Sequence, residues 1–243
     1  MQKETKPWYA SWFDTPFYHI LYQDRDEKEA AFLIKNLLNH LKLQPPAKIL
    51  DLACGKGRHS RYLNMLGYDV IGVDLSEQSI AYAKQYENNL LHFEVHNKLN
   101  PYPKQFDAVF NLFTSFGYFE NPDDNLKVIQ NIKTSLKPNG YGVIDFMNAH
   151  KTRINLVKEE TKIVDGIQFN LHRYVKNNVI YKDIRFNFEG KDYHFTERVS
   201  ALELEDFKRY FNEAGVELID VFGDFNLSPF DYENSNRLLL IFK

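Results

Sequence analysis

The stretch from Lys48 to Leu75 limits the possible folds of this 243-residue chain more than any other. Two apolar runs, 49–53 and 70–73, are too short for helices and are bounded by glycine and charged residues, which is typical of buried parallel strands. The segment between them has helical periodicity and stops at Gly67, a residue suited to a helix C-terminus. The stretch therefore predicts a β-α-β unit.

The turn after the first predicted strand carries Gly55 and Gly57. Glycine lets the backbone turn tightly and lets a ligand approach it closely, and the N–H groups at the start of the next helix favour a polar or anionic group. The second predicted strand ends at Asp74, where a carboxylate can bind both hydroxyls of a ribose. These features predict a site for an adenosine-containing ligand.

The glycine spacing bears on which ligand binds. Nicotinamide and flavin sites usually have three glycines in the pattern G-x-G-x-x-G, and the third position here is Ser60. The two-glycine turn, preceded by Asp51 and Cys54, suits the smaller ligand S-adenosylmethionine. A nicotinamide-dependent oxidoreductase on a Rossmann sheet is the alternative, and a binding test with NAD(H) would separate the two.

The rest of the chain continues the alternation of strands and helices. Strands are predicted at 91–95, 106–112 and 141–146, the last after a turn at 137–140, and two more close the chain at 216–221 and 238–242. This pattern predicts an α/β fold with a doubly wound, Rossmann-like seven-stranded sheet. Between 161 and 200, four runs separated by turns at 165–166, 177–178 and 189–190 predict an inserted antiparallel β-meander.

Three parts of the chain follow from this pattern. We expect an N-terminal helical lid at 1–45, a ligand-binding core at 46–150 and 201–243, and an antiparallel β insertion at 151–200 that covers the substrate side. The first part is rich in aromatic residues, which either pack against the body of the protein or close over the ligand.

The amino-acid composition limits which kinds of partner this chain can be expected to bind. The net charge of −3 argues against nucleic acid, which basic domains or stripes usually bind. The single cysteine excludes an internal disulfide and a cysteine-based metal site, and carboxylates are not clustered near the predicted site, so we expect no metal. No apolar run approaches the roughly 18 residues that cross a bilayer, and the start lacks the apolar region of a signal peptide. We expect a cytoplasmic protein with a small-molecule acceptor and no membrane partner, and the oligomeric state stays open.

Several motifs resemble one enzyme class. The run Asp51-Leu-Ala-Cys-Gly-x-Gly57, followed by Val73-Asp-Leu-Ser76, resembles motif I and the acidic loop of the class I S-adenosylmethionine-dependent methyltransferases. Phe17-Tyr-His-Ile-Leu-Tyr-x-x-Arg-Asp26 and Asn111-Leu-Phe-Thr-Ser-Phe-Gly-Tyr118 resemble a bacterial subgroup, and a late β insertion is similar to those of small-molecule enzymes, including sugar-amine N-methyltransferases. The resemblance implies S-adenosylmethionine as cofactor, S-adenosylhomocysteine as product, and a sheet closed by an antiparallel pair.

The resemblance also implies a role for each matching residue. Gly55 and Gly57 would approach the methionine part, Asp74 would bind the ribose hydroxyls, and Leu75 would cover the adenine. Asn97 stands where the family usually has Asp, and its side-chain oxygen can still accept a bond from the adenine amine. The full set of expected cofactor-binding residues is Tyr18, Asp51, Ala53, Cys54, Gly55, Gly57, Arg58, Asp74, Leu75, Asn97, Leu112 and Phe113.

Methyl transfer to an ammonium or hydroxyl needs a base, and His19 is the first candidate. Its expected polar partners are Tyr18, Tyr22 and Tyr118, of which Tyr18 and Tyr118 are expected to act in catalysis. Tyr18 also resembles a tyrosine that folds over the cofactor in related enzymes. Weaker candidates for contact with the substrate are His150, Arg153, His172 and Arg173. The sequence leaves open a second function, a non-catalytic module that binds S-adenosylmethionine or its demethylated product and acts through a partner.

Overall fold

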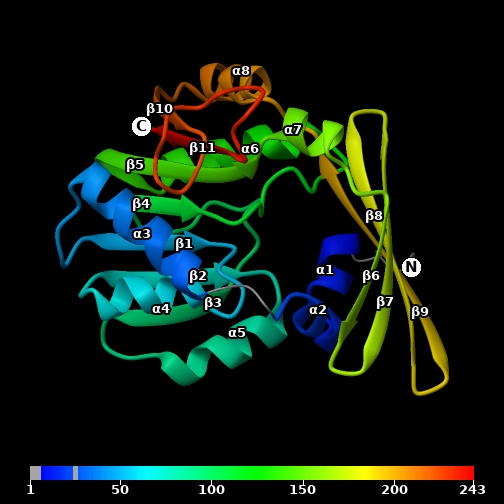
Figure 1. Ribbon diagram of the computed structural model, residues 1–243. Helices are drawn as coiled ribbons and strands as arrows, with labels where there is room; N and C mark the ends of the chain where they lie inside the picture. The colour runs from blue at the N-terminus through cyan, green and yellow to red at the C-terminus, as the bar shows by residue number, and fades with distance from the viewer. Residues whose placement is uncertain (1–6, 24–26) are drawn as a thin grey trace, which may run out of the picture.

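The computed structural model describes residues 7–23 and 27–243, so Arg25 and Asp26 of the N-terminal motif lie outside the described residues. Two sheets make up the fold (Figure 1). The larger has seven strands in the order β10-β11-β5-β4-β1-β2-β3. The five strands from β5 to β3 in this order are parallel to one another, and β11 is antiparallel to both of its neighbours, β10 and β5. The strands are β1 (Lys48–Leu52), β2 (Asp69–Asp74), β3 (Leu91–Val95), β4 (Phe106–Asn111), β5 (Leu136–Met147), β10 (Leu218–Phe222) and β11 (Arg237–Phe242).

Helices cover both faces of this sheet because its strands carry apolar residues on both sides. Strand β11 shows the alternation: Leu238 and Leu240 belong to one buried cluster, and Leu239 and Ile241 belong to the other. The first cluster includes α6 (Asp123–Thr134) and α8 (Leu204–Ala214). The second includes α3 (Glu27–Leu41), α4 (Arg58–Met65) and α5 (Glu77–Ala83), which leads into the short 3₁₀ helix η1 (Lys84–Tyr86).

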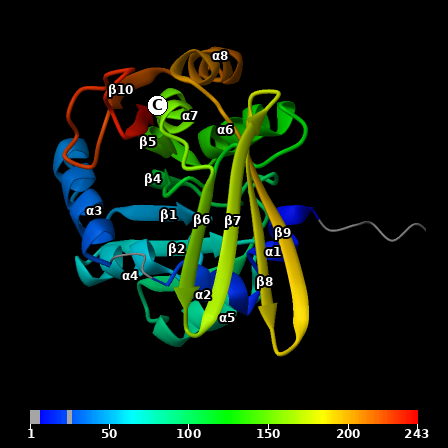
Figure 2. The same cartoon turned by 45° about the vertical axis from the view of Figure 1, so that its right-hand side comes forward.

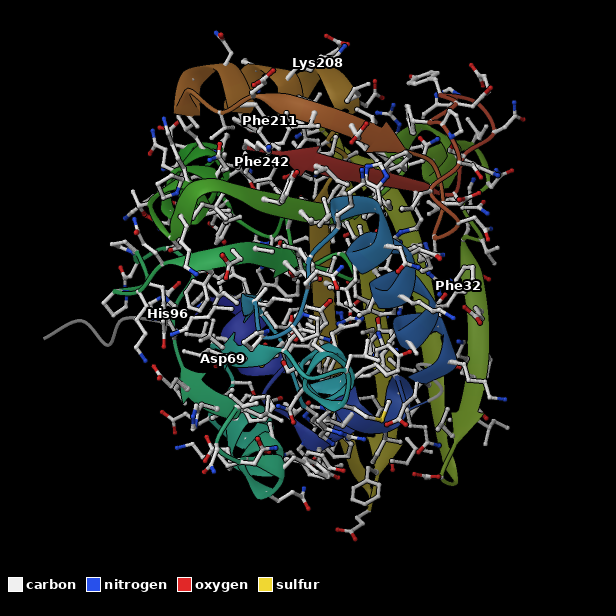
Figure 3. All side chains as sticks on the ribbon, turned by 90° about the vertical axis from the view of Figure 1, so that its left-hand side faces the viewer. Phe32, Asp69, His96, Lys208, Phe211 and Phe242 are labelled. Atoms are coloured by element: carbon white, nitrogen blue, oxygen red, sulfur yellow. The ribbon has the colours of Figure 1, made fainter. Side chains whose placement is uncertain are left out.

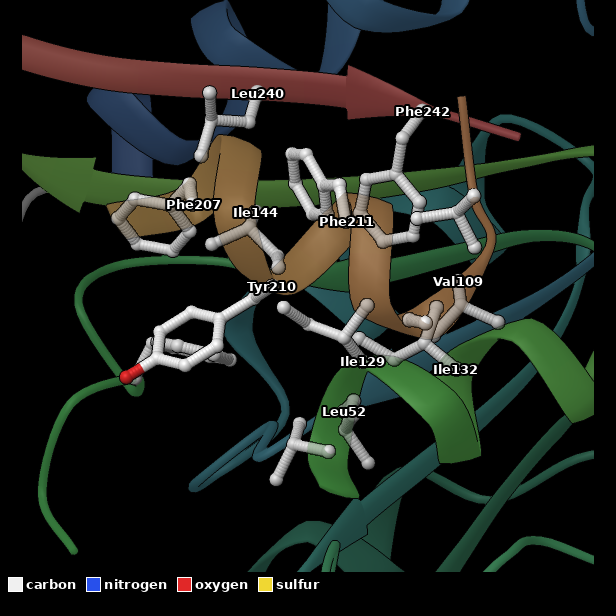
Figure 4. Packing of buried hydrophobic residues seen from close by; sticks show 14 of the residues in the cluster. Leu52, Val109, Ile129, Ile132, Ile144, Phe207, Tyr210, Phe211, Leu240 and Phe242 are labelled. Atoms are coloured by element: carbon white, nitrogen blue, oxygen red, sulfur yellow. The ribbon is translucent and has the colours of Figure 1, made fainter. Parts of the chain in front are cut away.

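Helix α8 illustrates how the sequence spacing forms the core. Phe207 and Phe211, one turn apart, point toward the sheet and pack near Ile144 and Phe242 (Figure 4). The ring centroids of Phe211 and Phe242 are 4.7 Å apart. Lys208, which lies off this buried face, is exposed and projects into solvent (Figure 3).

The smaller sheet is an antiparallel meander of four strands in the order β6-β7-β8-β9 that stands across the end of the larger one (Figure 2). Its strands are β6 (Glu159–Val164), β7 (Ile167–Lys176), β8 (Val179–Phe188) and β9 (Lys191–Ser200), and α7 (Ala149–Ile154) leads into it. Both central residues of each of its three turns have positive φ, as type I′ hairpin turns require. The predicted meander and its turns are confirmed.

Two short helices, α1 (Trp8–Trp12) and α2 (Pro16–Leu21), lie between the sheets (Figure 1). Trp12 is 1% exposed and packs in a third cluster with the inner face of the meander. Its indole N–H donates to a carboxylate oxygen of Glu197 on β9 over 2.7 Å, and the Tyr22 hydroxyl donates to the same carboxylate. The N-terminal segment is therefore fixed to the insertion.

The predicted fold class is confirmed, with one local error. The turn predicted at 137–140 lies within β5, which begins at Leu136 and contains Asn139 at a φ of +65°. Phe106 pairs with Leu136 and Ala108 pairs with Tyr141, so residues 137–140 of β5 oppose a single residue of β4. Among residues 7–23 and 27–243, the helices are all too short or too polar to cross a bilayer.

Candidate active site

A cavity of about 430 Å³ lies where β1, β2, β3 and β4 end, and the N-terminal helices form its opposite wall. Parallel sheets bind ligands beyond the carboxyl ends of their strands, where the strand order reverses, here between β1 and β4. The predicted residues that line the cavity are Tyr18, His19, Ala53, Cys54, Gly55, Arg58, Asp74, Leu75, Asn97, Leu112, Phe113 and Tyr118. Of the expected cofactor-binding and catalytic residues, Asp51 and Gly57 are the two absent from the described lining.

The two glycines of the β1–α4 turn have different surroundings. Gly55 lines the cavity with a φ of +56°, and a Cβ added there would have no atom within 4 Å. Gly57 has a φ of +80°, and its added Cβ would lie 2.6 Å from the Phe93 ring. Both positions favour glycine through φ, but only Gly55 leaves open space for a ligand beside the backbone.

Asp74 at the end of β2 is fixed by main-chain donors. Its Oδ2 accepts from the Gly55 N–H and its Oδ1 from the Ser76 N–H, both over 2.8 Å. Burial raises the pKa of Asp74, while these bonds and the charge of Lys98 act to lower it. Each carboxylate oxygen has a second lone pair, so an oriented Asp74 can still accept bonds from two ligand hydroxyls.

Asp51 lies beneath the turn and is 1% exposed. Its Oδ2 accepts from the Ser60 hydroxyl over 2.6 Å. Burial raises the pKa of Asp51 to about 6, with the nearby charge of Asp74 acting in the same direction. Ser60, the residue at the third glycine position, therefore supports the turn from below.

Asn97 follows β3 and lines the cavity. Its Oδ1 accepts from the Leu99 N–H over 3.0 Å, which fixes how the amide is oriented. One lone pair of this oxygen remains for a second donor, so the replacement of Asp by Asn preserves an acceptor at this position.

The loop after β4 has an unusual backbone, since Phe113 and Thr114 have φ values of +62° and +53°. Asp145 on β5, itself fully buried, stabilises this conformation: its Oδ2 accepts from the Phe113 N–H over 2.9 Å. Arg237 on β11 donates to Asp145 Oδ1 over 2.8 Å and to the Thr114 hydroxyl over 2.9 Å. The buried Asp145 and the half-buried Arg237 together hold the strained loop that faces the cavity. Arg237 could not be predicted from the sequence, because no local signal links it to residues so distant along the chain.

Aromatic side chains form the wall opposite the glycine turn. The Tyr18 ring packs against Phe13 at a centroid distance of 4.8 Å, and Phe13 packs against Tyr118 at 5.3 Å. The Tyr118 hydroxyl donates to the Thr114 carbonyl, which joins this wall to the β4 loop. His19 lies on α2 and lines the same cavity. The three residues expected in catalysis are thus brought together.

The four weaker candidates have partners elsewhere, and they are absent from the described lining of the cavity. His150 bonds Glu233 over 2.8 Å and stacks on Tyr232. On the insertion, Arg173 pairs with Glu160 over 2.6 Å. The other two, Arg153 and His172, pair with Glu203 and Asp183.

Comparison with known proteins supports the interpretation of this cavity as a cofactor site. Residues 49–140 match a family model described as a methyltransferase domain, and this match contains the glycine turn, Asp74 and Asn97. Over this part the chain is similar to methyltransferase domains, and its fold resembles that of solved S-adenosylmethionine-dependent methyltransferases. These matches favour S-adenosylmethionine, the predicted cofactor, over a nicotinamide.

Individual methyltransferases match over different lengths. Glycine/sarcosine N-methyltransferase of Aphanothece halophytica is 27% identical over 85% of this chain and 78% of its own. The probable methyltransferase TehB of Haemophilus influenzae is 34% identical over 45% of this chain, but the chain spans only 39% of TehB. The fold of an S-adenosylmethionine-dependent methyltransferase from Clostridium acetobutylicum superposes with a TM-score of 0.78 at 18% identity, covering 93% of this chain and 95% of that one.

The residues around the cavity fit this cofactor. The open space beside Gly55 leaves room for a ligand chain against the backbone, and Asp74 presents oriented acceptors next to it. Phe113 and Tyr118 supply aromatic surfaces near the β4 loop, and such rings attract a cationic sulfonium.

Proposed function

We propose that this protein transfers a methyl group from S-adenosylmethionine to a nitrogen or oxygen nucleophile of a small molecule. The observation that carries the proposal is the single cavity shared by the glycine turn, Asp74 and the aromatic wall with His19. A ligand bound to the strand ends would have its reactive centre covered by the N-terminal helices, which is the arrangement that direct transfer to a second small ligand requires.

The cofactor would be held mainly by the strand ends. We assign the methionine part to the turn at Gly55, the ribose to Asp74, the adenine to Leu75 and Asn97, and the sulfonium region to the β4 loop. Two further expected residues would support the site without binding the cofactor directly. Arg58 lies 4.7 Å over the Phe113 ring, and Asp51 holds the glycine turn through its bond to Ser60. The bound cofactor supplies a methyl carbon activated by the adjacent sulfonium.

The protein's own part in the reaction is alignment and proton transfer. A lone pair of the acceptor must approach the methyl carbon in line with the bond that breaks, and positioning of this kind contributes roughly 7–11 kcal/mol to lowering a barrier. His19 would accept the proton that the acceptor nitrogen or oxygen loses, with Tyr18 and Tyr118 orienting the acceptor beside it. The aromatic wall would exclude water from the reacting groups.

The relatives support a small acceptor. A relative that covers most of this chain is named a glycine/sarcosine N-methyltransferase, and a fold neighbour, from Streptoalloteichus, is a sugar N-methyltransferase. The net charge of −3 gives no support for a nucleic-acid substrate. An amine is therefore the first class to test, and hydroxyl compounds are the second.

The test is turnover with labelled S-adenosylmethionine and a panel of small amines, amino acids, amino sugars and hydroxyl compounds. Formation of S-adenosylhomocysteine in step with a labelled acceptor would support the proposal. Tight binding of the cofactor without turnover of any acceptor would instead favour the alternative, a non-catalytic module. The His19→Ala variant serves as the matched control for background transfer.

A further inference from the structure

Asp14 lies in the loop between α1 and α2 and attaches this N-terminal segment to the main sheet. Its Oδ1 accepts from the Ser76 hydroxyl over 2.7 Å and from the Gln78 N–H over 3.1 Å. Both donors lie at the start of α5, directly after the strand end that carries Asp74, and Figure 1 shows the N-terminal helices beside this end of α5. One carboxylate oxygen thus joins two parts of the chain that are more than 60 residues apart.

Ser76 connects this attachment to the predicted ribose site. It is 6% exposed, and its N–H donates to Asp74 Oδ1 over 2.8 Å while its hydroxyl donates to Asp14. The other oxygen of Asp74 accepts from the Gly55 N–H. A continuous row of hydrogen bonds therefore leads from the N-terminal segment through Ser76 and Asp74 to the glycine turn. Leu75, which we assign to the adenine, lies between the two residues at the centre of this row.

The residues on either side of Asp14 help to form the cavity wall. Phe13 lines the cavity and packs against Tyr18 at a centroid distance of 4.8 Å. Thr15 is the N-cap of α2, and its hydroxyl accepts from the Tyr18 N–H over 3.2 Å. Asp14 therefore fixes the corner from which Tyr18, the residue expected to fold over the cofactor, is placed.

The same segment is attached on the opposite side of the cavity. The Trp8 indole N–H donates to the Tyr118 carbonyl over 3.2 Å, in the loop after β4. A ligand bound to the strand ends is thus enclosed between two attachments, one at β2 through Asp14 and one at β4 through Trp8.

We propose that Asp14 is a positioning residue for the cofactor, which couples the N-terminal segment to the ribose and adenine contacts and keeps the segment closed over the bound cofactor. This inference rests on the proposed function, because it takes S-adenosylmethionine to bind in this cavity. The coupling is reciprocal. A ligand that fixes Asp74 and Leu75 also fixes Ser76 and strengthens the attachment, and an attached segment slows the release of the ligand.

The experiment measures the release of radiolabelled S-adenosylhomocysteine in a rapid-filtration chase with unlabelled ligand. Asp14→Ala removes both bonds, and Asp14→Asn keeps a neutral oxygen acceptor. We expect release from Asp14→Ala to be about tenfold faster than from wild type, the lower end of what bonds to charged groups contribute. Association should be nearly unchanged, and Asp14→Asn should lie between the two.

Tryptophan fluorescence reports on the segment directly, because both tryptophans of the chain, Trp8 and Trp12, lie on α1. Bound S-adenosylhomocysteine should protect them from quenching by acrylamide in the wild type. Asp14→Ala should lose part of this protection at saturating ligand. Equal protection in the two proteins would overturn the proposal.

Controls separate the coupling from a general loss of charge or structure. Asp123→Ala removes the same charge from the exposed start of α6, outside the described lining of the cavity, and should follow the wild type. In a Ser76→Ala background, Asp14→Ala should accelerate release much less, because the hydroxyl that it binds is gone.

A wild-type release rate in Asp14→Ala would overturn the proposal. An equal acceleration with and without the Ser76 hydroxyl would overturn it as well, and so would a loss of affinity that appears only in slower association, the sign of a damaged site. A wild-type protein that binds no S-adenosylhomocysteine would instead refute the proposed function itself.

Discussion

Three single glycine substitutions, two of them in the β1–α4 turn, separate the effects of backbone strain, core packing and ligand binding. Gly57→Ala places a Cβ 2.6 Å from the Phe93 ring at a φ of +80°. A left-handed non-glycine residue costs about 1–2 kcal/mol, and overpacking a well-filled core costs about 1–3 kcal/mol more. We therefore expect Gly57→Ala to lower the free energy of unfolding by about 2–5 kcal/mol and the melting temperature by roughly 5–15 °C.

Gly55→Ala introduces similar backbone strain but no clash, since the new methyl group would enter open cavity space. Its expected loss of stability is only about 1–2 kcal/mol, while its affinity for S-adenosylhomocysteine should fall because the methyl group occupies the ligand's side of the turn. Gly166→Ala is the matched control: Gly166 has a φ of +78° and open space around it, but it lies in the β6–β7 turn of the insertion. That variant should lose the same stability as Gly55→Ala and no affinity.

Thermal unfolding and calorimetric titration of the three variants provide the measurement. We expect Gly57→Ala to be the least stable of the three variants, and Gly55→Ala to bind S-adenosylhomocysteine more weakly than Gly166→Ala, which has similar stability. Equal stability of Gly57→Ala and Gly166→Ala would refute the packing role of Phe93, and wild-type affinity in Gly55→Ala would refute the assignment of the ligand to this side of the turn.

Three further outcomes follow from the site. Asp74→Ala should weaken binding of S-adenosylhomocysteine by about 1.5–3 kcal/mol, roughly 10- to 150-fold in calorimetry, because charge-assisted bonds to the ligand are lost; unchanged affinity would remove Asp74 from the ribose site. His19→Ala should reduce turnover while cofactor affinity stays near that of the wild type, and a wild-type rate would exclude His19 as the base. Because burial raises the pKa of Asp51 from 3.8 to about 6, its contribution to stability is present below pH 3.8 and lost as the pH rises through 6. Asp51→Asn should therefore gain stability relative to wild type by about 2–3 kcal/mol between pH 4 and 7 in urea unfolding curves, and a pH-independent difference would contradict the raised pKa.

Local patterns explain what could be predicted from the sequence. The β1–α4–β2 unit was recognisable because short apolar runs, a helical period and two glycines lie within one continuous stretch. The meander was recognisable because each of its turns contains residues that tolerate positive φ. The error at 137–140 has the same origin: residues typical of turns occur there within an irregular strand, whose pairing with β4 decides the outcome.

Distant contacts explain what could not be predicted. The conformation at Phe113 and Thr114 depends on Asp145 and on Arg237, which is 123 residues further along the chain. The bond from Lys98 to the Ser115 carbonyl gave no local signal either, because it joins the loops after β3 and β4, two strands that are not neighbours in the sheet. Such contacts arise from the topology of the sheet and leave no periodicity in the sequence.

The third buried cluster, in which α1 and α2 pack on the meander, is separate from the two clusters on the faces of the main sheet. Trp12 and Glu197 are 185 residues apart, yet they join the first part of the chain to a late insertion. The wall that would meet the acceptor thus has its own core, and substitutions there can reshape it without disturbing the packing that positions the strand ends. A scaffold built in this way can acquire new acceptors over evolution while it keeps one methyl donor.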